Sequence, residues 1–271
     1  MKRLAVLAAI AAASISSALF AADKQGNDIP IHKDWKLVLD QDFSKIKEVD
    51  KKLWNIVDKG DGFGNNEKQY YTPDNITFDN GDLVITGKKE DHKGKKYTSA
   101  KLTTEGKWSI KYGRIEACIK APKAQQGNWP AFWMLGDNIP KVGWPRCGEI
   151  DIMELINKSD KLYATMHWGK DQGNQYTLGG GKNFSEDYHI YAVEWEKGVI
   201  RSYCDNVYFG KVDQDAPFNQ GFFIIMNYAI GGQWPKDPDG SSTYPQEMRV
   251  KYVRVYASPD SVIYVNGKES K

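Results

Sequence analysis

At 271 residues, 27% of them charged and evenly spread, the chain is long enough for one large domain or two small ones and has no tract that suggests disorder. Lys2 and Arg3 are the only charged residues among the first 22, which leaves 35 of the 37 Lys and Arg residues against 35 Asp and Glu. This balance gives neither a nucleic acid nor an anionic membrane an electrostatic reason to bind, and we expect neither as a partner.

The N-terminus has the pattern of a secretory signal peptide. A basic pair precedes the apolar run Leu4 to Ala13, and small residues follow up to Ala22. We expect residues 1–22 to be removed, residues 23–34 to form a flexible polar segment, and the product to be secreted or periplasmic. No later run is long and apolar enough to span a bilayer.

From Trp35 onward the chain consists of short apolar or alternating runs separated by turn residues. This pattern, without helical periodicity, an internal repeat or a linker, predicts one all-β sandwich or barrel over residues 35–258. In residues 259–271, Val262–Val265 is either a last edge strand or part of a tail. Clear examples of the earlier runs are Trp35–Leu39, Asp82–Thr86, Gly113–Ile119, Tyr188–Trp195 and Phe222–Asn227.

The run Gly148–Glu154 places three acids within six residues. Glu149 and Asp151 alternate with isoleucines, which is the period of a half-buried strand. In a regular strand Glu154 would point into the core, where a lone carboxylate is costly. A β-bulge at Ile152-Met153 would turn Glu154 onto the face of Glu149 and Asp151. We therefore expect three acids in a row on one open face.

A row of acids has a chemical use. Breaking a glycosidic bond with retention needs a carboxylate nucleophile and a carboxylic acid with carboxyl groups ~5–5.5 Å apart. The Cα atoms of Glu149 and Glu154 would be roughly 13 Å apart along a strand, but side chains on the concave side of a curved sheet converge. The alternative is three solvated charges on an exposed face. Three acids flanked by Trp-rich segments favour catalysis.

Aromatic residues make up 13% of the chain, including nine Trp. Trp129 and Trp133 share one strand face, where flat rings can stack on the apolar faces of sugars, and Trp144 lies close to the acids in the sequence. The alternative is that these rings fill the core. We expect the core position for Trp54 and Trp195, and substrate contact for the other three.

Six runs resemble family 16 glycoside hydrolases, over Trp35 to Tyr256. The run Trp144–Glu154 resembles the active-site strand of the branch with an inserted residue before the last Glu. Together the runs look most like laminarinases, which are endo-β-1,3-glucanases. The other matching runs are Gly64–Thr72, Tyr97–Thr104, Tyr112–Ala117, Trp129–Gly136 and Val253–Tyr256.

The resemblance implies a β-jelly-roll sandwich whose concave sheet forms an open substrate cleft for a polysaccharide. It implies retention, with Glu149 as the nucleophile, Glu154 as the acid and base, and Asp151 orienting Glu149. Three close carboxylates cannot all ionise cheaply, so a raised pKa should keep Glu154 protonated.

We expect a monomer. Further implied sugar contacts are Asn65, Arg114 and His167, the last of which could equally be structural, with Asn227 and Trp234 toward the aglycone side.

Two other hypotheses about the function of the chain remain. A non-catalytic glucan-binding protein of this fold would lack the catalytic acids, whereas all three are present here. An enzyme with the same mechanism could act on mixed-linkage β-glucan or on a marine galactan, because the sequence shows the bond-breaking groups better than the polymer.

No metal or other cofactor is expected. The chain has four His and no closely spaced Cys pair, which disfavours a catalytic metal. Many members of the resembling family carry a structural calcium, with an acid two residues before the Val-Arg-Val-Tyr run. Lys251 stands there in this chain, and calcium takes only oxygen ligands. An ion pair between Lys251 and Asp42 could stand in place of the metal.

The three cysteines are an odd number for an exported protein. Cys204 shares the parity of Ile200 and is expected to be a buried free thiol. Cys118 and Cys147 share the parity of Arg114 and Glu149, so both are expected on the cleft side. A bridge between them remains open.

Overall fold

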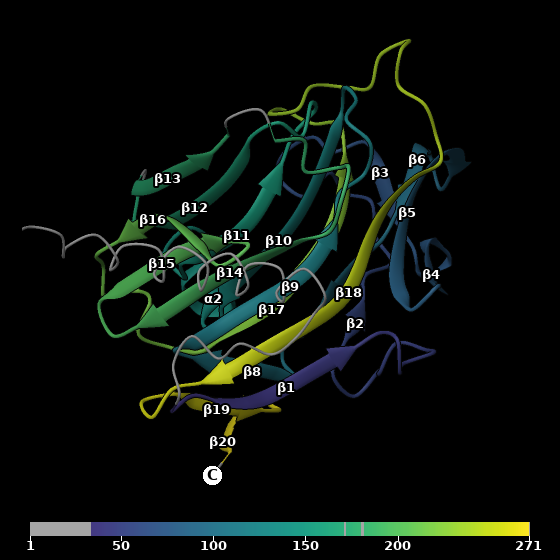
Figure 1. Cartoon of the computed structure of the whole chain (residues 1–271). Helices are drawn as coiled ribbons and strands as arrows, with labels where there is room; N and C mark the ends of the chain where they lie inside the picture. Colours follow the sequence, from purple (N-terminus) through teal and green to yellow (C-terminus); the bar gives the residue numbers. More distant parts are fainter. Residues whose placement is uncertain (1–33, 171, 180–181, 271) are drawn as a thin grey trace, which may run out of the picture. The chain divides into compact units, whose positions relative to one another are not determined.

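The computed structural model describes residues 34–170, 172–179 and 182–270. The predicted signal peptide, and the predicted flexible segment apart from Asp34, lie outside the described residues. The described chain forms two sheets of ten strands each (Figure 1), which confirms the all-β prediction. No helix in the described ranges is long and apolar enough to cross a membrane.

The first sheet contains the long strand β18, which lies between β9 and β5. Neighbouring strands of this sheet pair antiparallel, except that β3 and β6 are parallel. In spatial order the strands are β16 (Val207–Val212), β15 (Val199–Cys204), β14 (His189–Glu196), β9 (Gly113–Lys120), β18 (Gln246–Ala257), β5 (Asp82–His92), β6 (Lys95–Ser99) and β3 (Gln69–Tyr71), with β1 (Lys36–Asp42) beside β18 and β4 (Ile76–Asp79) beside β5.

The second sheet contains the strand that carries the three acids. A 3-10 turn, Pro73–Asn75, and one short helix, α2 (Ile139–Val142), complete the described elements. Val262–Val265 forms β19, which pairs antiparallel with β8. In spatial order the strands are β13 (Gln172–Leu178), β12 (Leu162–Trp168), β11 (Glu149–Leu155), β10 (Asn128–Gly136), β17 (Phe222–Ile230), β8 (Trp108–Lys111), β19 (Val262–Val265) and β20 (Lys268–Ser270), with β7 (Lys101–Thr103) beside β17 and β2 (Asn55–Ile56) beside β7.

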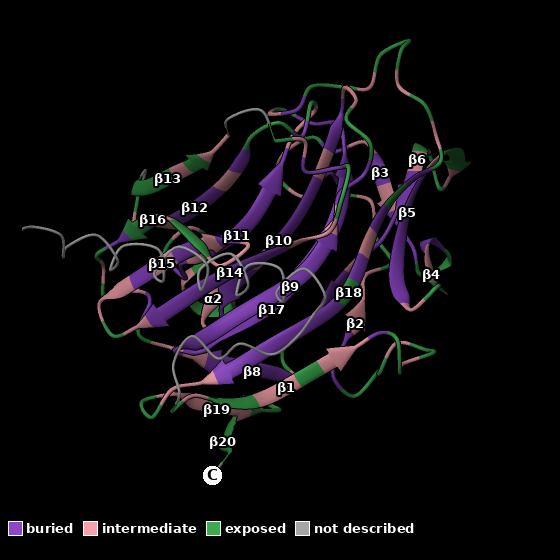
Figure 2. Cartoon of the chain, in the orientation of Figure 1, coloured by how far each residue is buried: buried purple, intermediate pink, exposed green. Residues whose placement is uncertain are grey.

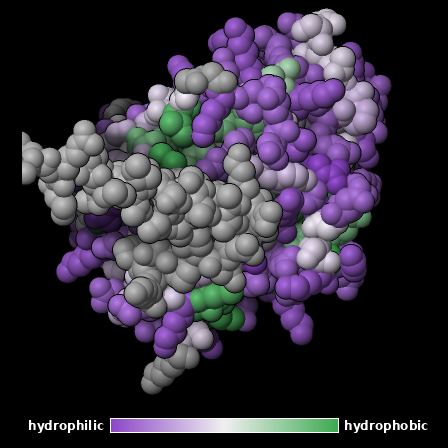
Figure 3. Space-filling model, viewed as in Figure 1, coloured by the Kyte–Doolittle hydropathy of each residue, from purple (hydrophilic) through white to green (hydrophobic). Residues whose placement is uncertain are grey.

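The core lies between the sheets, and the central strands are buried along most of their length (Figure 2). Ile115 and Val253 of the first sheet and Phe132 and Ile150 of the second are 0% exposed and belong to this cluster. Trp54 and Trp195 are 1% and 0% exposed, so the prediction that they fill the core is confirmed. On the face viewed in Figure 3 the described residues are mostly hydrophilic.

All three cysteines are free and buried. Cys204 lies in the core cluster, which confirms the prediction of a buried free thiol. Cys118 packs on the first sheet with Ile190 and Tyr252, so its predicted cleft position is wrong. Cys147 packs beside Leu135 on the second sheet. Both thiols are free, so no Cys118–Cys147 bridge forms.

The predicted Lys251–Asp42 ion pair is also wrong. The Asp42 carboxylate lies 2.7 Å from the Lys45 ammonium and accepts a hydrogen bond from the Ser44 hydroxyl. The Lys251 ammonium instead lies 4.2 Å from the centroid of the Tyr188 ring, in a cation–π contact. Asp42 therefore has Lys45 as its partner, Lys251 has the Tyr188 ring, and the absence of calcium stays a prediction.

Candidate active site

A β-bulge aims the acids of β11. In the pairing with β10, Trp133 is opposite Asp151 and Phe132 is opposite Met153, so Ile152 is the extra residue. The same shift appears between Asp151 and Glu154 in the pairing with β12. Ile152 and Met153 are both 0% exposed and pack in the core. Two successive core side chains return Glu154 to the face of Asp151, as predicted.

Gly148 fixes the start of this strand. Its φ is +82°, a left-handed conformation that favours glycine, and an added Cβ would come within 2.8 Å of the Phe222 ring. The strand therefore leaves a tight turn at Gly148 and presents Glu149 at its first position. A larger residue here would displace the strand on which all three acids depend.

The three acids and His167 lie together. His167, on the adjacent strand β12, is directly opposite Glu149 in the register. Its Nε2 atom lies 3.4 Å from Asp151 Oδ2 and 3.8 Å from Glu149 Oε1. The Asp151 side chain is only 5% exposed, whereas the His167 side chain is 34% exposed. A solvent-facing imidazole thus covers two nearly buried carboxylates.

Two indoles hold the outer acids. Trp144 Nε1–H donates to Glu149 Oε2 at 3.1 Å, and Trp129 Nε1–H donates to Glu154 Oε1 at 2.9 Å. Trp144 is also one of the most exposed large apolar residues, at 58%. Each ring can therefore orient a carboxylate with its edge while its face remains available to a sugar.

Burial raises the pKa of all three carboxyl groups. For Glu154 burial outweighs the hydrogen bond from Trp129 and raises the pKa to about 7. Burial and then the charge of Asp151 raise the pKa of Glu149, whereas His167 and the Trp144 hydrogen bond act in the opposite direction. Burial and the charge of Glu154 raise the pKa of Asp151. The cluster therefore shares protons near neutral pH, and the ionised form of Glu149 has two groups that favour it.

This raised pKa predicts a pH-dependent stability. The pKa of Glu154 rises from 4.5 to about 7 on folding, so between these pH values the folded state binds more protons and the free energy of unfolding falls as pH rises. Replacing Glu154 with Gln removes that loss. The Tm advantage of Glu154→Gln over wild type should be at least ~2 °C larger at pH 8 than at pH 4.5 by calorimetry. The exposed Glu48→Gln is the control, and an advantage independent of pH would contradict this account.

The Glu154 end of the row is lined with aromatic rings. Trp234 makes edge contacts with Trp129 and Tyr163, with ring centroids 5.6 and 4.9 Å apart. Tyr163 is directly opposite Glu154 in the β11–β12 register. Tyr163 also lines a hollow of about 720 Å³, together with residues that include Gln125 and Asn157. Sequence reasoning singled out Trp129 and Trp234 and missed Tyr163, because only the bulged register brings it beside Glu154.

A buried hydrogen-bond chain supports Trp133. Trp133 Nε1–H donates to Asn227 Oδ1 at 2.7 Å, and Asn227 Nδ2–H donates to the Tyr71 hydroxyl at 3.1 Å. Tyr71 in turn donates to Glu67 Oε2 at 3.1 Å. The Asn227 side chain thus links Trp133 to Tyr71 by hydrogen bonds. The backbone carbonyl of Asn65 accepts a hydrogen bond from the backbone N–H of Gln233, which ties Asn65 to that loop.

Lys101 is a second residue that sequence reasoning missed. It lies on β7, opposite Asn227 of β17. Its ammonium is 4.8 Å from the centroid of Trp133 and 5.0 Å from that of Phe63. Burial lowers its pKa, against the attraction of Glu67 and Glu149. The run Tyr97–Thr104 resembles the family, but the sequence alone does not distinguish this lysine from others. Only the fold brings the rings of Trp133 and Phe63 to it.

The predicted sugar contact of Arg114 is wrong. Arg114 lies on β9 of the first sheet, and its neighbour Ile115 points into the core, so Arg114 faces away from the second sheet. Its Nε atom lies 2.7 Å from Glu116 Oε2 and its Nη1 atom 3.2 Å from Glu194 Oε1. The guanidinium is therefore part of a buried ionic cluster on the opposite face of the sandwich.

The bulge gives a test of register. Deleting Met153 gives Glu-Ile-Asp-Ile-Glu, a regular alternation that keeps all three acids on one face. We expect this variant to fold and to retain reduced activity, and an Ala inserted after Met153 to be far more damaging. Met153→Ala keeps the register and controls for the lost core side chain, ~2–5 kcal/mol of stability. An active insertion variant with an inactive deletion variant would show that register does not aim Glu154.

Comparison with known proteins shows which family this chain resembles. The model of the family "Glycosyl hydrolases family 16" matches residues 63–254. A beta-glucanase of Rhodothermus marinus is 36% identical over 247 residues, which cover 82% of this chain and 85% of that protein. The laminarinase catalytic domain of Thermotoga maritima MSB8 has 40% identity and a TM-score of 0.78, over 84% of this chain and 100% of that chain.

A third relative is much longer than this chain. The clotting factor G alpha subunit of Tachypleus tridentatus is 40% identical over 232 residues, which cover 82% of this chain. The matched region is only 34% of that subunit. The chain therefore spans about a third of this relative, which has a large part with no counterpart in the match.

Proposed function

The chain belongs to glycosyl hydrolases family 16, and from this premise we propose that it is an endo-β-1,3-glucanase that cleaves laminarin-type glucan with retention of anomeric configuration. The observation that carries the proposal is the bulged strand, which sets Glu149, Asp151 and Glu154 on one face with His167 above them. The names of the Rhodothermus and Thermotoga relatives agree with a β-glucan substrate.

In the first step Glu149 attacks the anomeric carbon and the glycosidic C–O bond breaks. Glu154 gives its proton to the departing oxygen, and a covalent glycosyl ester forms on Glu149. The pKa of about 7 leaves a substantial fraction of Glu154 protonated at neutral pH, and this step requires that form. In the second step Glu154 takes a proton from water, which attacks the ester and releases the sugar in its original configuration.

The surrounding groups position the reactants. The Trp144 hydrogen bond and the imidazole of His167 favour the carboxylate form of Glu149. Trp133 and Trp144 are proposed to stack glucose units on the Glu149 side, and Trp129, Tyr163 and Trp234 on the leaving-group side. The side chains of Asn65 and Asn227 are proposed to contribute hydrogen bonds at the edges of these subsites. Export through the N-terminal segment and a monomeric state are part of the same proposal.

The test is hydrolysis of a panel of defined polymers. Laminarin should be cleaved to β-1,3-linked oligosaccharides with internal cuts from the start, and mixed-linkage glucan, agar and carrageenan more slowly or not at all. Faster cleavage of mixed-linkage glucan or of a galactan would replace the substrate while keeping the mechanism. Binding of laminarin without hydrolysis of any polymer would identify a glucan-binding protein instead.

A further inference from the structure

The donor atoms of Glu149, Asp151 and His167 have the spacing of a chelate. They all lie within 4.8 Å of one another. The two distances from His167 Nε2, 3.4 Å to Asp151 and 3.8 Å to Glu149, exceed the ~2.7–3.2 Å of a good hydrogen bond. A zinc ion with ~2.0–2.2 Å bonds in tetrahedral geometry holds its ligand atoms roughly 3.3–3.6 Å apart. Small side-chain movements would bring all three atoms to such an ion.

The surroundings of Asp151 give a second reason for a cation to bind here. Its side chain is only 5% exposed and points into the cluster. Among the described residues its carboxylate has one ion-pair contact, with His167 Nε2 at 3.4 Å, and it lies beside the like-charged carboxylates of Glu149 and Glu154. A cation would offset the repulsion among these carboxylates and the cost of burying them. The His167 side chain is 34% exposed, so the cluster is reachable from solvent.

We propose that Glu149, Asp151 and His167 bind a zinc-class divalent cation, which competes with the glucan for the cleft. Two carboxylates and one imidazole suit such an ion and leave a fourth position for water. Only the inhibitory effect of the cation rests on the proposed function, and the binding of the cation does not. With its oxygen bound to the ion, Glu149 cannot attack the anomeric carbon, so the cation is an inhibitor.

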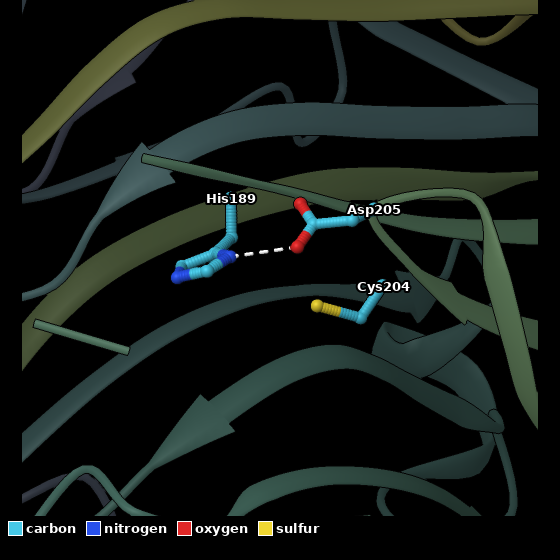
Figure 4. Close-up of side chains that lie close together, drawn as sticks. All are labelled: His189, Cys204 and Asp205. Atoms are coloured by element: carbon cyan, nitrogen blue, oxygen red, sulfur yellow. Dashed lines mark hydrogen bonds and ion pairs between the residues drawn. The ribbon is translucent and has the colours of Figure 1, made fainter. Parts of the chain in front are cut away.

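A second group of donors is less suited to an ion. His189, Cys204 and Asp205 also lie within 4.8 Å of one another. His189 Nδ1 is only 2.8 Å from Asp205 Oδ2, which is a direct hydrogen bond (Figure 4), and the other Asp205 oxygen accepts from the Ile190 backbone N–H. The Lys182 ammonium lies 3.8 Å from Asp205 and would repel a cation. These donors are already satisfied, so we place the ion at His167.

The experiment uses the full chain without an affinity tag. Titration with Co²⁺ should give the visible absorption of four-coordinate cobalt without the near-ultraviolet band of a thiolate ligand, and Zn²⁺ should displace it one-to-one in calorimetry. His167→Gln and Asp151→Asn should each weaken binding by more than the ~10–100-fold typical of changes outside the ligand set. Glu154→Gln and Cys204→Ser keep all three donors and should bind as wild type does.

Each outcome decides the proposal. A thiolate band that Cys204→Ser removes would put the ion at the second cluster, and unchanged affinity in His167→Gln would show surface binding only; either result overturns the inference. Glu154→Gln separates this inference from the proposed function, because it lacks the acid but retains the ligands. On laminarin, Zn²⁺ should raise KM and leave kcat unchanged. Binding without this competitive pattern would contradict the inhibitory role.

Discussion

Glu149→Gln is expected to abolish hydrolysis of β-1,3-glucan while the fold and glucan binding remain. The amide has nearly the same shape as the carboxylate, and its oxygen can still accept the Trp144 hydrogen bond seen at 3.1 Å. It cannot form the glycosyl ester, so kcat should fall by more than about 100-fold. Initial rates on laminarin and calorimetric binding of a laminarin oligosaccharide to the variant measure the two effects separately.

The matched control is Glu48→Gln, the same change at an exposed position. It should keep the wild-type rate. If Glu149→Gln retained more than about a hundredth of wild-type activity, the loss would be too small for covalent catalysis, and Glu149 would not be the nucleophile.

Glu154→Ala should lose activity on glucan, whereas aryl glycosides with good leaving groups should still form the Glu149 ester. Such leaving groups depart without a proton, so the first step no longer needs the acid. The second step then lacks its base, and added azide, which needs no deprotonation, should restore the rate. Because azide attacks the Glu149 ester from the opposite face, the product should be the β-glycosyl azide, which proton NMR identifies.

The mirror-image variant is the control for this assignment. In Glu149→Ala, azide can occupy the space of the missing carboxylate and attack the substrate directly, with Glu154 as the acid, to give the α-glycosyl azide. An α-azide from Glu154→Ala and a β-azide from Glu149→Ala would mean that the two acids have exchanged roles.

The strand pattern and the row of acids could be predicted from local sequence, because strand parity is a local property. The alternation of acids and isoleucines set the face of Glu149 and Asp151, and the cost of a buried carboxylate at Glu154 required the bulge that β11 contains. The core positions of Trp54 and Trp195 followed from apolar context. Each of these predictions needed only a few neighbouring residues.

Other features depend on which strands become neighbours, and parity carries no such information. Arg114 has the parity of an outward-facing residue, but its strand belongs to the first sheet, so it faces away from the cleft. Asp42 has the nearer Lys45 as a partner, which left Lys251 to the Tyr188 ring. Lys101 enters the site only because β7 pairs with β17. Lys101 and Lys251 are far in sequence from the rings they meet, whereas Lys45 is only three residues from Asp42.

The central claim is that Glu149 forms a covalent bond with the sugar, and trapping that ester tests it most directly. In a 2-deoxy-2-fluoro laminaribiosyl fluoride, the fluoride on the anomeric carbon is a good leaving group. The fluorine at the 2-position destabilises the transition state for hydrolysis of the ester, so the intermediate should accumulate. Mass spectrometry of the intact chain should show one added glycosyl unit, and peptide mapping should place it on Glu149. A label on Asp151 or Glu154, or turnover of the reagent with release of the α-anomer and no ester, would contradict the account.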